Sequence, residues 1–214
     1  MHLIAITSVI LPKNAPTVFS TEERFHQLLD TIKSARCKIP DCLVVVIEGS
    51  SYTADQAQAV MESGAHMIVN INVDVYDKQS GESSLLRTFF SSDMFSDLRE
   101  KHNILSIAKL SGRYVLTDDF VFHYDDETCI CKISEPENSY SGHGFLYTRY
   151  YSFPIIYLDN FLQGLDECCH HGIFINIEHS FYLYQALPLH KINLERQKIN
   201  VGGRIASNGE YVED

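Results

Sequence analysis

Two adjacent carboxylates, Asp118 and Asp119, follow an apolar run at a spacing that suits metal chemistry. The run Ile104–Leu110 ends in a small-residue turn, Ser111–Gly112, which carries the cation Arg113. In α/β folds, ligands bind at the carboxyl ends of the strands. Paired aspartates at such an edge indicate Mg²⁺ or Mn²⁺, which take oxygen ligands and are often shared with substrate phosphates. A solvated turn with two surface acids is the simpler alternative, because so short a motif is not specific.

A second candidate site follows the buried run Leu43–Ile47. There, Glu48, Gly49 and Ser50 form a strand-end turn in which the carboxylate could accept hydrogen bonds from a base or a ribose. A Gly-Ser turn with a solvated glutamate explains the pattern equally well. The segment Lys78–Glu82 places a cation and a carboxylate at an expected helix start, where free backbone donors favour a diphosphate. Ordinary helix capping is the alternative there.

Two groups suited to proton transfer, Glu178 and His179, end the apolar run Ile173–Ile177. Either side chain could act as a general base toward a substrate hydroxyl. The alternative is that one of them caps the next helix. We favour Glu178 as the base, ahead of His179.

Strands and helices must position these groups, and the order in which strands and helices are expected along the chain predicts an α/β fold. Apolar runs alternate with helices opened by two capping boxes, Ser20–Glu23 and Thr53–Gln56. That order implies right-handed crossovers and a mostly parallel, Rossmann-like sheet flanked by helices, with a smaller antiparallel part in the second half. The expected strands are Leu3–Leu11, Leu43–Ile47, Met67–Val73, Ile104–Leu110, Val121–Tyr124, Cys129–Ile133 and Phe145–Tyr151. Further helices are expected over Ser83–Phe90, up to about Glu100, over Ile155–Cys169 and up to Leu187, with a glycine-rich loop over Val201–Gly209.

Composition limits the partners of the chain. It has 214 residues, 17 basic and 28 acidic, with a formal net charge of −11. This charge argues against nucleic acid or an anionic membrane as a partner, so local donors or a metal must hold any phosphate-bearing ligand. No apolar run approaches the length of a membrane span, and no signal peptide is visible. Six irregularly spaced cysteines form no disulfide framework, so we expect a cytoplasmic protein.

Together these segments resemble the GT-A glycosyltransferases, which transfer a sugar from a nucleotide diphosphate donor. The run Ile47–Thr53 matches the strand-end acid and Gly-Ser turn that hold uracil and ribose in that superfamily, and Thr7–Ser8 matches its first nucleotide loop. The segments Ser20–Pro40 and Lys109–Tyr114 are similar in particular to the N-terminal domain of glycosyltransferases encoded by chlorella viruses. The resemblance covers most of the chain.

The resemblance implies one GT-A domain over residues 1–214, with a nucleotide-sugar-binding part to about 120 and an acceptor and catalytic part beyond. It implies a UDP-sugar donor, a Mn²⁺ or Mg²⁺ cofactor and a glycan or glycoprotein acceptor, such as a viral capsid glycan in the host-cell cytoplasm. Glu178 falls where inverting members carry their catalytic carboxylate; retention of configuration would require another role for it. The expected donor-binding residues are Thr7, Ser8, Glu48, Gly49, Ser50, Lys78, Ser80, Lys109, Arg113 and Arg204.

The sequence departs from the superfamily where the fourth strand ends. The superfamily has an Asp-x-Asp motif there, whereas this chain has Ser111-Gly112-Arg113. Three arrangements could compensate, in order of preference: a metal site shifted to Asp118 and Asp119; a metal site at Asp74 and Asp77, after the third strand; or direct neutralisation of the diphosphate by Arg113 and Lys109, with the metal weakly held or absent.

Two other functions fit the same layout. One is a sugar-nucleotide-binding module without catalysis, which unlike a transferase would release no sugar from the donor to water. The other is a nucleotidyltransferase, but the loop after the first strand, Leu11–Pro16, lacks the glycine-rich, basic character of that class.

Overall fold

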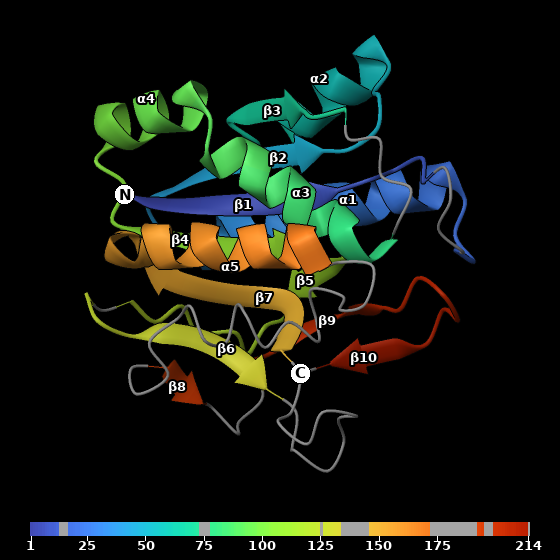
Figure 1. The fold of residues 1–214 in the computed structure, drawn as a ribbon. Helices are drawn as coiled ribbons and strands as arrows, with labels where there is room; N and C mark the ends of the chain where they lie inside the picture. Colours follow the sequence, from blue (N-terminus) through green and yellow to red (C-terminus); the bar gives the residue numbers. More distant parts are fainter. Residues whose placement is uncertain are drawn as a thin grey trace.

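A seven-stranded sheet forms the centre of the protein, with the strand order β3-β2-β1-β4-β7-β6-β8. The computed structural model describes residues 1–12, 17–72, 78–124, 126–133, 146–171, 192–194 and 199–213. Strands β1 to β4 are mutually parallel, β7 is antiparallel to both β4 and β6, and β8 is parallel to β6. The strands are β1 His2–Ser8, β2 Cys42–Glu48, β3 Met67–Asn70, β4 Ser106–Ser111, β6 Cys129–Ile133, β7 Leu146–Pro154 and β8 Ile192–Leu194. The predicted mostly parallel α/β fold is confirmed (Figure 1).

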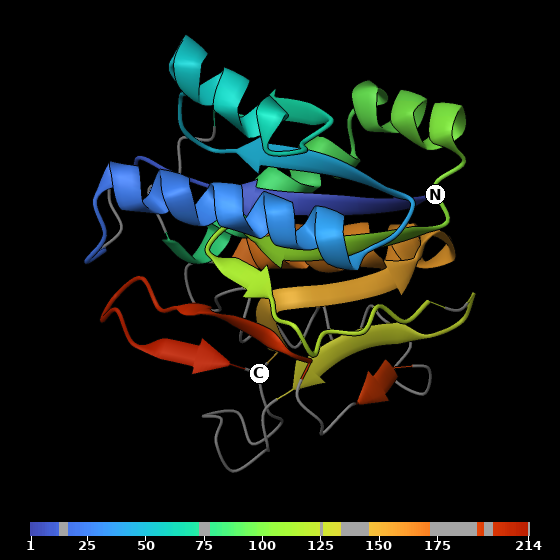
Figure 2. The same cartoon turned by 180° about the vertical axis from the view of Figure 1, so that it is seen from behind.

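A second, antiparallel sheet lies beside the first, in the order β10-β9-β5. Its strands are β5 Tyr114–Leu116, β9 Val201–Arg204 and β10 Tyr211–Glu213. Only two residues separate β4 from β5, so the small sheet is connected directly to the end of a central strand of the large sheet. Figure 2 shows the β9–β10 hairpin below α1, on the side of the molecule that faces the viewer there.

Helices cover both faces of the large sheet. They are α1 Thr21–Lys38, α2 Ala54–Glu62, α3 Lys78–Phe90, α4 Asp93–His102 and α5 Leu158–His171, the last preceded by a 3₁₀ turn over Ile155–Tyr157. Both predicted capping boxes are present: Ser20 and Glu23 cap α1 reciprocally, and Thr53 and Gln56 do the same for α2. Among the residues that the structure describes, no helix is both long and apolar enough to cross a membrane.

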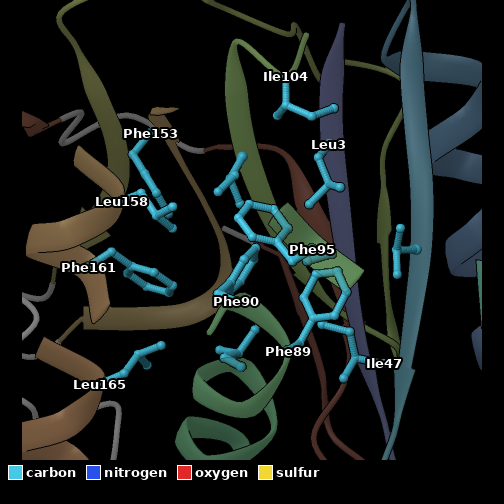
Figure 3. Packing of buried hydrophobic residues seen from close by; sticks show 14 of the residues in the cluster. Leu3, Ile47, Phe89, Phe90, Phe95, Ile104, Phe153, Leu158, Phe161 and Leu165 are labelled. Carbon is cyan, nitrogen blue, oxygen red and sulfur yellow. The ribbon is translucent and has the colours of Figure 1, made fainter. Parts of the chain in front are cut away.

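The core consists of two apolar layers, one on each face of the sheet. On one face, Leu3 and Ala5 of β1 join the cluster formed with α3, α4 and α5, where Phe89, Phe95 and Phe161 are almost fully buried (Figure 3). On the other face, alternate residues of the same strand pack under α1 and α2. The alternation follows from the strand period of two, and burial on both faces explains why β1 is an unbroken apolar run.

Several predicted boundaries were wrong. The expected loop over Val201–Gly209 contains β9, which pairs with β5. A Cβ at Gly203 would lie 2.5 Å from the carbonyl oxygen of Arg113, so glycine permits this close pairing although it normally disfavours strands. The expected strand Val121–Tyr124 is irregular; the rings of Phe122 and Tyr124 pack against His2, so their apolar character reflects ring packing.

Two other segments also differ from their predictions. The first strand ends at Ser8 instead of Leu11, because the backbone N–H of Ile10 leaves the ladder and donates to a side chain of the neighbouring strand end, Glu48. The helix expected over Ser83–Phe90 begins earlier, so the segment Lys78–Glu82 is the first part of α3. The expected helix up to Leu187 lies outside the described residues.

Candidate active site

Three parallel strands end side by side at one edge of the large sheet. In the register of the strands, Ser8 of β1 is opposite Glu48 of β2, and Thr7 is opposite Ser111 of β4. This is the carboxyl edge, where α/β folds bind ligands. The structure therefore brings together the predicted donor-binding residues of β1 and β2 and the turn that follows β4.

The turn after β4 packs tightly against the end of β1. The backbone N–H of Gly112 donates to the Thr7 carbonyl oxygen over 2.8 Å. A Cβ at Gly112 would lie 3.0 Å from that oxygen and 3.1 Å from a methyl group of Leu28 in α1. Only a residue without a side chain fits this space comfortably, and the chain then delivers Arg113 to the same edge.

The carboxylate of Glu48 is completely buried and organises the loops around it. Its Oε1 accepts from the backbone N–H groups of Ile10 (3.1 Å) and Ser50 (2.9 Å) and from the Ser50 hydroxyl, and its Oε2 accepts from the Tyr52 hydroxyl (2.7 Å). A carboxylate has about four acceptor positions, and protein donors already use that number. In this arrangement the side chain shapes the loops after β1 and β2, and the direct contact between Glu48 and the donor stays a prediction.

We expect Tyr52→Phe to lower the free energy of unfolding by about 1.5–3 kcal/mol, because it removes a hydrogen bond to a buried charge. Burial, and then the negative charge of Glu48, raises the pKa of Tyr52 far above its ordinary value, so its hydroxyl remains a donor. Urea unfolding measures the change, with Tyr211→Phe, at an exposed tyrosine, as the control. Equal stability of the two variants would contradict the role given to this hydroxyl.

Below the edge lies a buried ion pair. The ammonium of Lys109, in β4, is completely buried and forms an ion pair with Glu82 of α3. It also donates to the Ser111 hydroxyl over 2.6 Å and to the carbonyl oxygen of Thr148 in β7. The Thr7 hydroxyl donates to the same carboxylate oxygen of Glu82 over 2.6 Å. Lys109 and Thr7, both predicted to contact the donor, thus connect β1, β4, β7 and α3 to one another.

Two arginines lie at the same edge. Arg24, in the first turn of α1, donates through Nε to the Val9 carbonyl oxygen over 2.9 Å. Burial, and then the positive charge of Arg113, lowers the pKa of Arg24 to about 10, while the negative charge of Glu48 opposes the shift. The Arg113 guanidinium carbon lies 5.8 Å from the centroid of the Tyr114 ring. Within the described part of the chain, neither arginine forms an ion pair.

The first-ranked metal candidates lie elsewhere. Asp118 pairs with Lys38, the last residue of α1, with 3.2 Å between Nζ and Oδ1. Since α1 crosses back from β1 to the start of β2, this pair lies toward the opposite edge of the sheet from Ser111. The backbone of Asp119 accepts from the Asn200 side chain over 3.0 Å. The structure does not bring these two aspartates to the strand ends.

Of the remaining predicted site residues, three belong to described elements and four lie outside the described residues. Arg204 donates to the carbonyl oxygen of Gly209 within its own hairpin over 2.9 Å. Lys78 and Ser80 belong to the first turn of α3. The predicted base candidates and the second pair of metal candidates lie outside the described residues: Glu178, His179, Asp74 and Asp77.

Sequence reasoning gave no role at this site to Arg24 or Tyr52, and it considered Glu82 only as part of the segment Lys78–Glu82. One signal was available for Arg24. A cation in the first turn of a helix opposes the helix dipole, so its presence there is unfavourable unless something nearby offsets it. Tyr52 and Glu82 carried no such signal, because only the fold reveals that they reach Glu48 and Lys109.

Among the residues that the structure describes, the carboxylates at this edge do not fit a divalent cation. Glu48 is surrounded by four donors, and Glu82 accepts from Lys109 and Thr7. In the described ranges, no group of three or more His, Cys, Asp or Glu side chains could hold a metal ion. The side chain that β4 presents at its end is a cation, Arg113, whereas Mn²⁺ and Mg²⁺ prefer oxygen ligands.

Comparison with known proteins identifies the fold. No family model and no curated protein matches the sequence. Among solved structures, the chain is similar to core-mannan synthase A of Aspergillus fumigatus in its Mn/GDP form, with a TM-score of 0.53 and 10% identity over 94% of this chain and 74% of that one. It is also similar to the glycosyltransferase GlyE of Streptococcus pneumoniae, with a TM-score of 0.54 and 9% identity over 91% of this chain.

These similarities show that the chain has a fold found in glycosyltransferases, as the sequence resemblance predicted. The chain spans 45% of the length of GlyE, so that protein contains much that has no counterpart in this sequence. Neither structure is viral, and the resemblance to chlorella-virus enzymes stays a prediction. At such low identity the likeness extends to the fold alone, so function must be argued from the site.

Proposed function

We propose that this protein is a glycosyltransferase that moves a sugar from a nucleotide-sugar donor, a UDP-sugar, to a hydroxyl of a glycan or glycoprotein acceptor. The observation that supports this most is the convergence at one sheet edge of Ser8, the Gly49–Ser50 turn and two guanidinium groups. The loops after β1 and β2 are held in shape by the buried Glu48. Such an edge offers backbone donors to a nucleoside and cations to a diphosphate.

In the proposed reaction, the acceptor oxygen attacks the anomeric carbon of the sugar as the bond from that carbon to the diphosphate oxygen breaks. The acceptor hydroxyl loses its proton to Glu178, and the nucleoside diphosphate leaves with the electron pair of the broken bond. Inversion at the anomeric carbon follows from this single displacement. The residues at the strand ends bind and orient the donor, which brings the reacting atoms together.

Thermal-shift titration with UDP, GDP and CMP, each with EDTA or with Mn²⁺, tests this proposal. We expect UDP to raise the Tm most. At 100 times its Kd, a ligand stabilises the folded state by about 2.7 kcal/mol. For a chain of this size that corresponds to a Tm increase of roughly 5–10 °C. Equal shifts for all three nucleotides would contradict the uridine assignment, and no shift with any of them would contradict the function.

A second measurement separates a transferase from a binding module. A transferase releases some sugar from its donor to water when no acceptor is present, whereas a binding module releases none. Incubation of the protein with UDP-glucose, UDP-galactose or UDP-N-acetylglucosamine, followed by chromatography for free UDP, therefore distinguishes the two functions.

A further inference from the structure

We propose that the guanidinium groups of Arg24 and Arg113 bind the diphosphate of the donor directly, so that donor binding does not require a divalent cation. This inference rests on the proposed function and specifies how the donor is held. It corresponds to direct neutralisation of the diphosphate at the end of β4, with one change from the sequence-based expectation: Arg24 replaces Lys109 as the partner of Arg113.

The first step of the argument is that Lys109 is already occupied. Its ammonium is completely buried, pairs with Glu82 and donates to Ser111 and Thr148. A diphosphate could recruit this ammonium only by breaking a buried ion pair, which is costly. Lys109 therefore holds β4, β7 and α3 together next to the strand ends and does not bind the diphosphate itself.

The second step is that the fold brings Arg24 and Arg113 to the same strand-end edge, where the positive charge of Arg113 acts on Arg24. They come from different elements, the first turn of α1 and the turn after β4, and the tight packing of Gly112 on β1 and Leu28 holds the two elements together. Arg24 is anchored by neutral acceptors: Nε and Nη2 donate to the Val9 carbonyl oxygen at 2.9 and 2.5 Å, and Nη1 donates to the Thr17 hydroxyl at 3.5 Å. In the described part of the chain, no carboxylate forms an ion pair with either arginine. The negative charge of Glu48 partly offsets the effect of Arg113 on the pKa of Arg24.

The third step concerns the ligand that would offset these two positive charges. The planar guanidinium donates two parallel hydrogen bonds to phosphate, and it keeps its charge at every physiological pH. Two such groups at one strand-end edge match the two phosphates of a nucleoside diphosphate. The formal charge of the whole protein is −11, so its overall field repels this ligand and the local pair must attract it.

Isothermal titration calorimetry with UDP and uridine, on wild type and Arg113→Ala, tests the inference. For the wild type in EDTA, we expect UDP to bind with a Kd within about threefold of its value in Mn²⁺. For Arg113→Ala, we expect UDP binding to weaken by about 10- to 100-fold, because charge-assisted hydrogen bonds to phosphate are lost. Uridine has no phosphate, so its affinity should be the same for both proteins. If GDP gives the largest thermal shift, GDP and guanosine replace this pair.

Two further variants distinguish a direct phosphate contact from a general effect of charge. Arg99→Ala removes an exposed arginine of α4 and matches the change in net charge, so it should leave UDP binding unchanged. Arg24→Lys keeps the charge but not the planar fork, and should weaken UDP binding without affecting uridine. Unfolding curves for each variant show whether the fold is intact.

The outcomes separate the two proposals. A requirement for Mn²⁺ in UDP binding, or an equal loss of UDP and uridine affinity in Arg113→Ala, would overturn the arginine site and leave the glycosyltransferase proposal standing. If the wild type binds no nucleotide and no nucleoside, the proposed function fails and the arginine site fails with it.

Discussion

Replacing Glu82 with glutamine is expected to lower the free energy of unfolding by about 3–5 kcal/mol, because the change removes a carboxylate that pairs with the buried ammonium of Lys109. Lys109 is completely buried, so water cannot take the place of the lost carboxylate. Single domains are stable by only about 5–15 kcal/mol, so the expected loss is a large fraction of the total. Urea unfolding followed by circular dichroism gives the value, with Glu100→Gln, at an exposed acid in α4, as the control.

The opposite replacement, Lys109→Met, is expected to cost less than Glu82→Gln. The side chain of Glu82 is 21% exposed, so water can hydrate its carboxylate after the ammonium is gone. The double variant should be more stable than the sum of the two single losses predicts, since it leaves neither charge unpaired. If the losses of the two single variants simply add, the two side chains do not act as a pair.

Replacing Glu178 with glutamine is expected to reduce kcat for sugar transfer by about 10²- to 10⁴-fold, because the amide cannot accept the acceptor proton. The Kd for UDP should stay within about twofold of the wild-type value, since the base acts on the acceptor hydroxyl and not on the nucleotide. Release of UDP in the presence of acceptor measures the rate, and calorimetry measures the affinity.

His179→Asn is the matched control for the adjacent imidazole. A loss of transfer in this variant, together with near wild-type transfer in Glu178→Gln, would assign the base to His179. If both variants retain transfer, the proposed proton transfer to Glu178 in a single displacement is contradicted. The nucleotide-binding part of the proposal would still stand.

Much of the fold was predictable because its signals are local. The capping boxes at Ser20 and Thr53 determine where α1 and α2 begin, and each depends on residues three positions apart. The buried strands β1 and β2 are short apolar runs, which one-dimensional patterns detect well. The sequence pattern did not predict β9, because Val201–Arg204 contains two glycines and glycine is rare in strands. Glycine is needed there because β5, a strand far earlier in the chain, pairs closely with β9.

The site was predictable in location and less so in detail. The sequence by itself determined that Glu48 and Arg113 each follow an apolar run, and parallel strands bring their carboxyl ends to one edge. The tertiary structure decided what each group does there. It buries Lys109 against Glu82, surrounds Glu48 with protein donors and sets Arg24 near Arg113. Those roles depend on burial and on contacts between distant segments, which residue order does not encode locally.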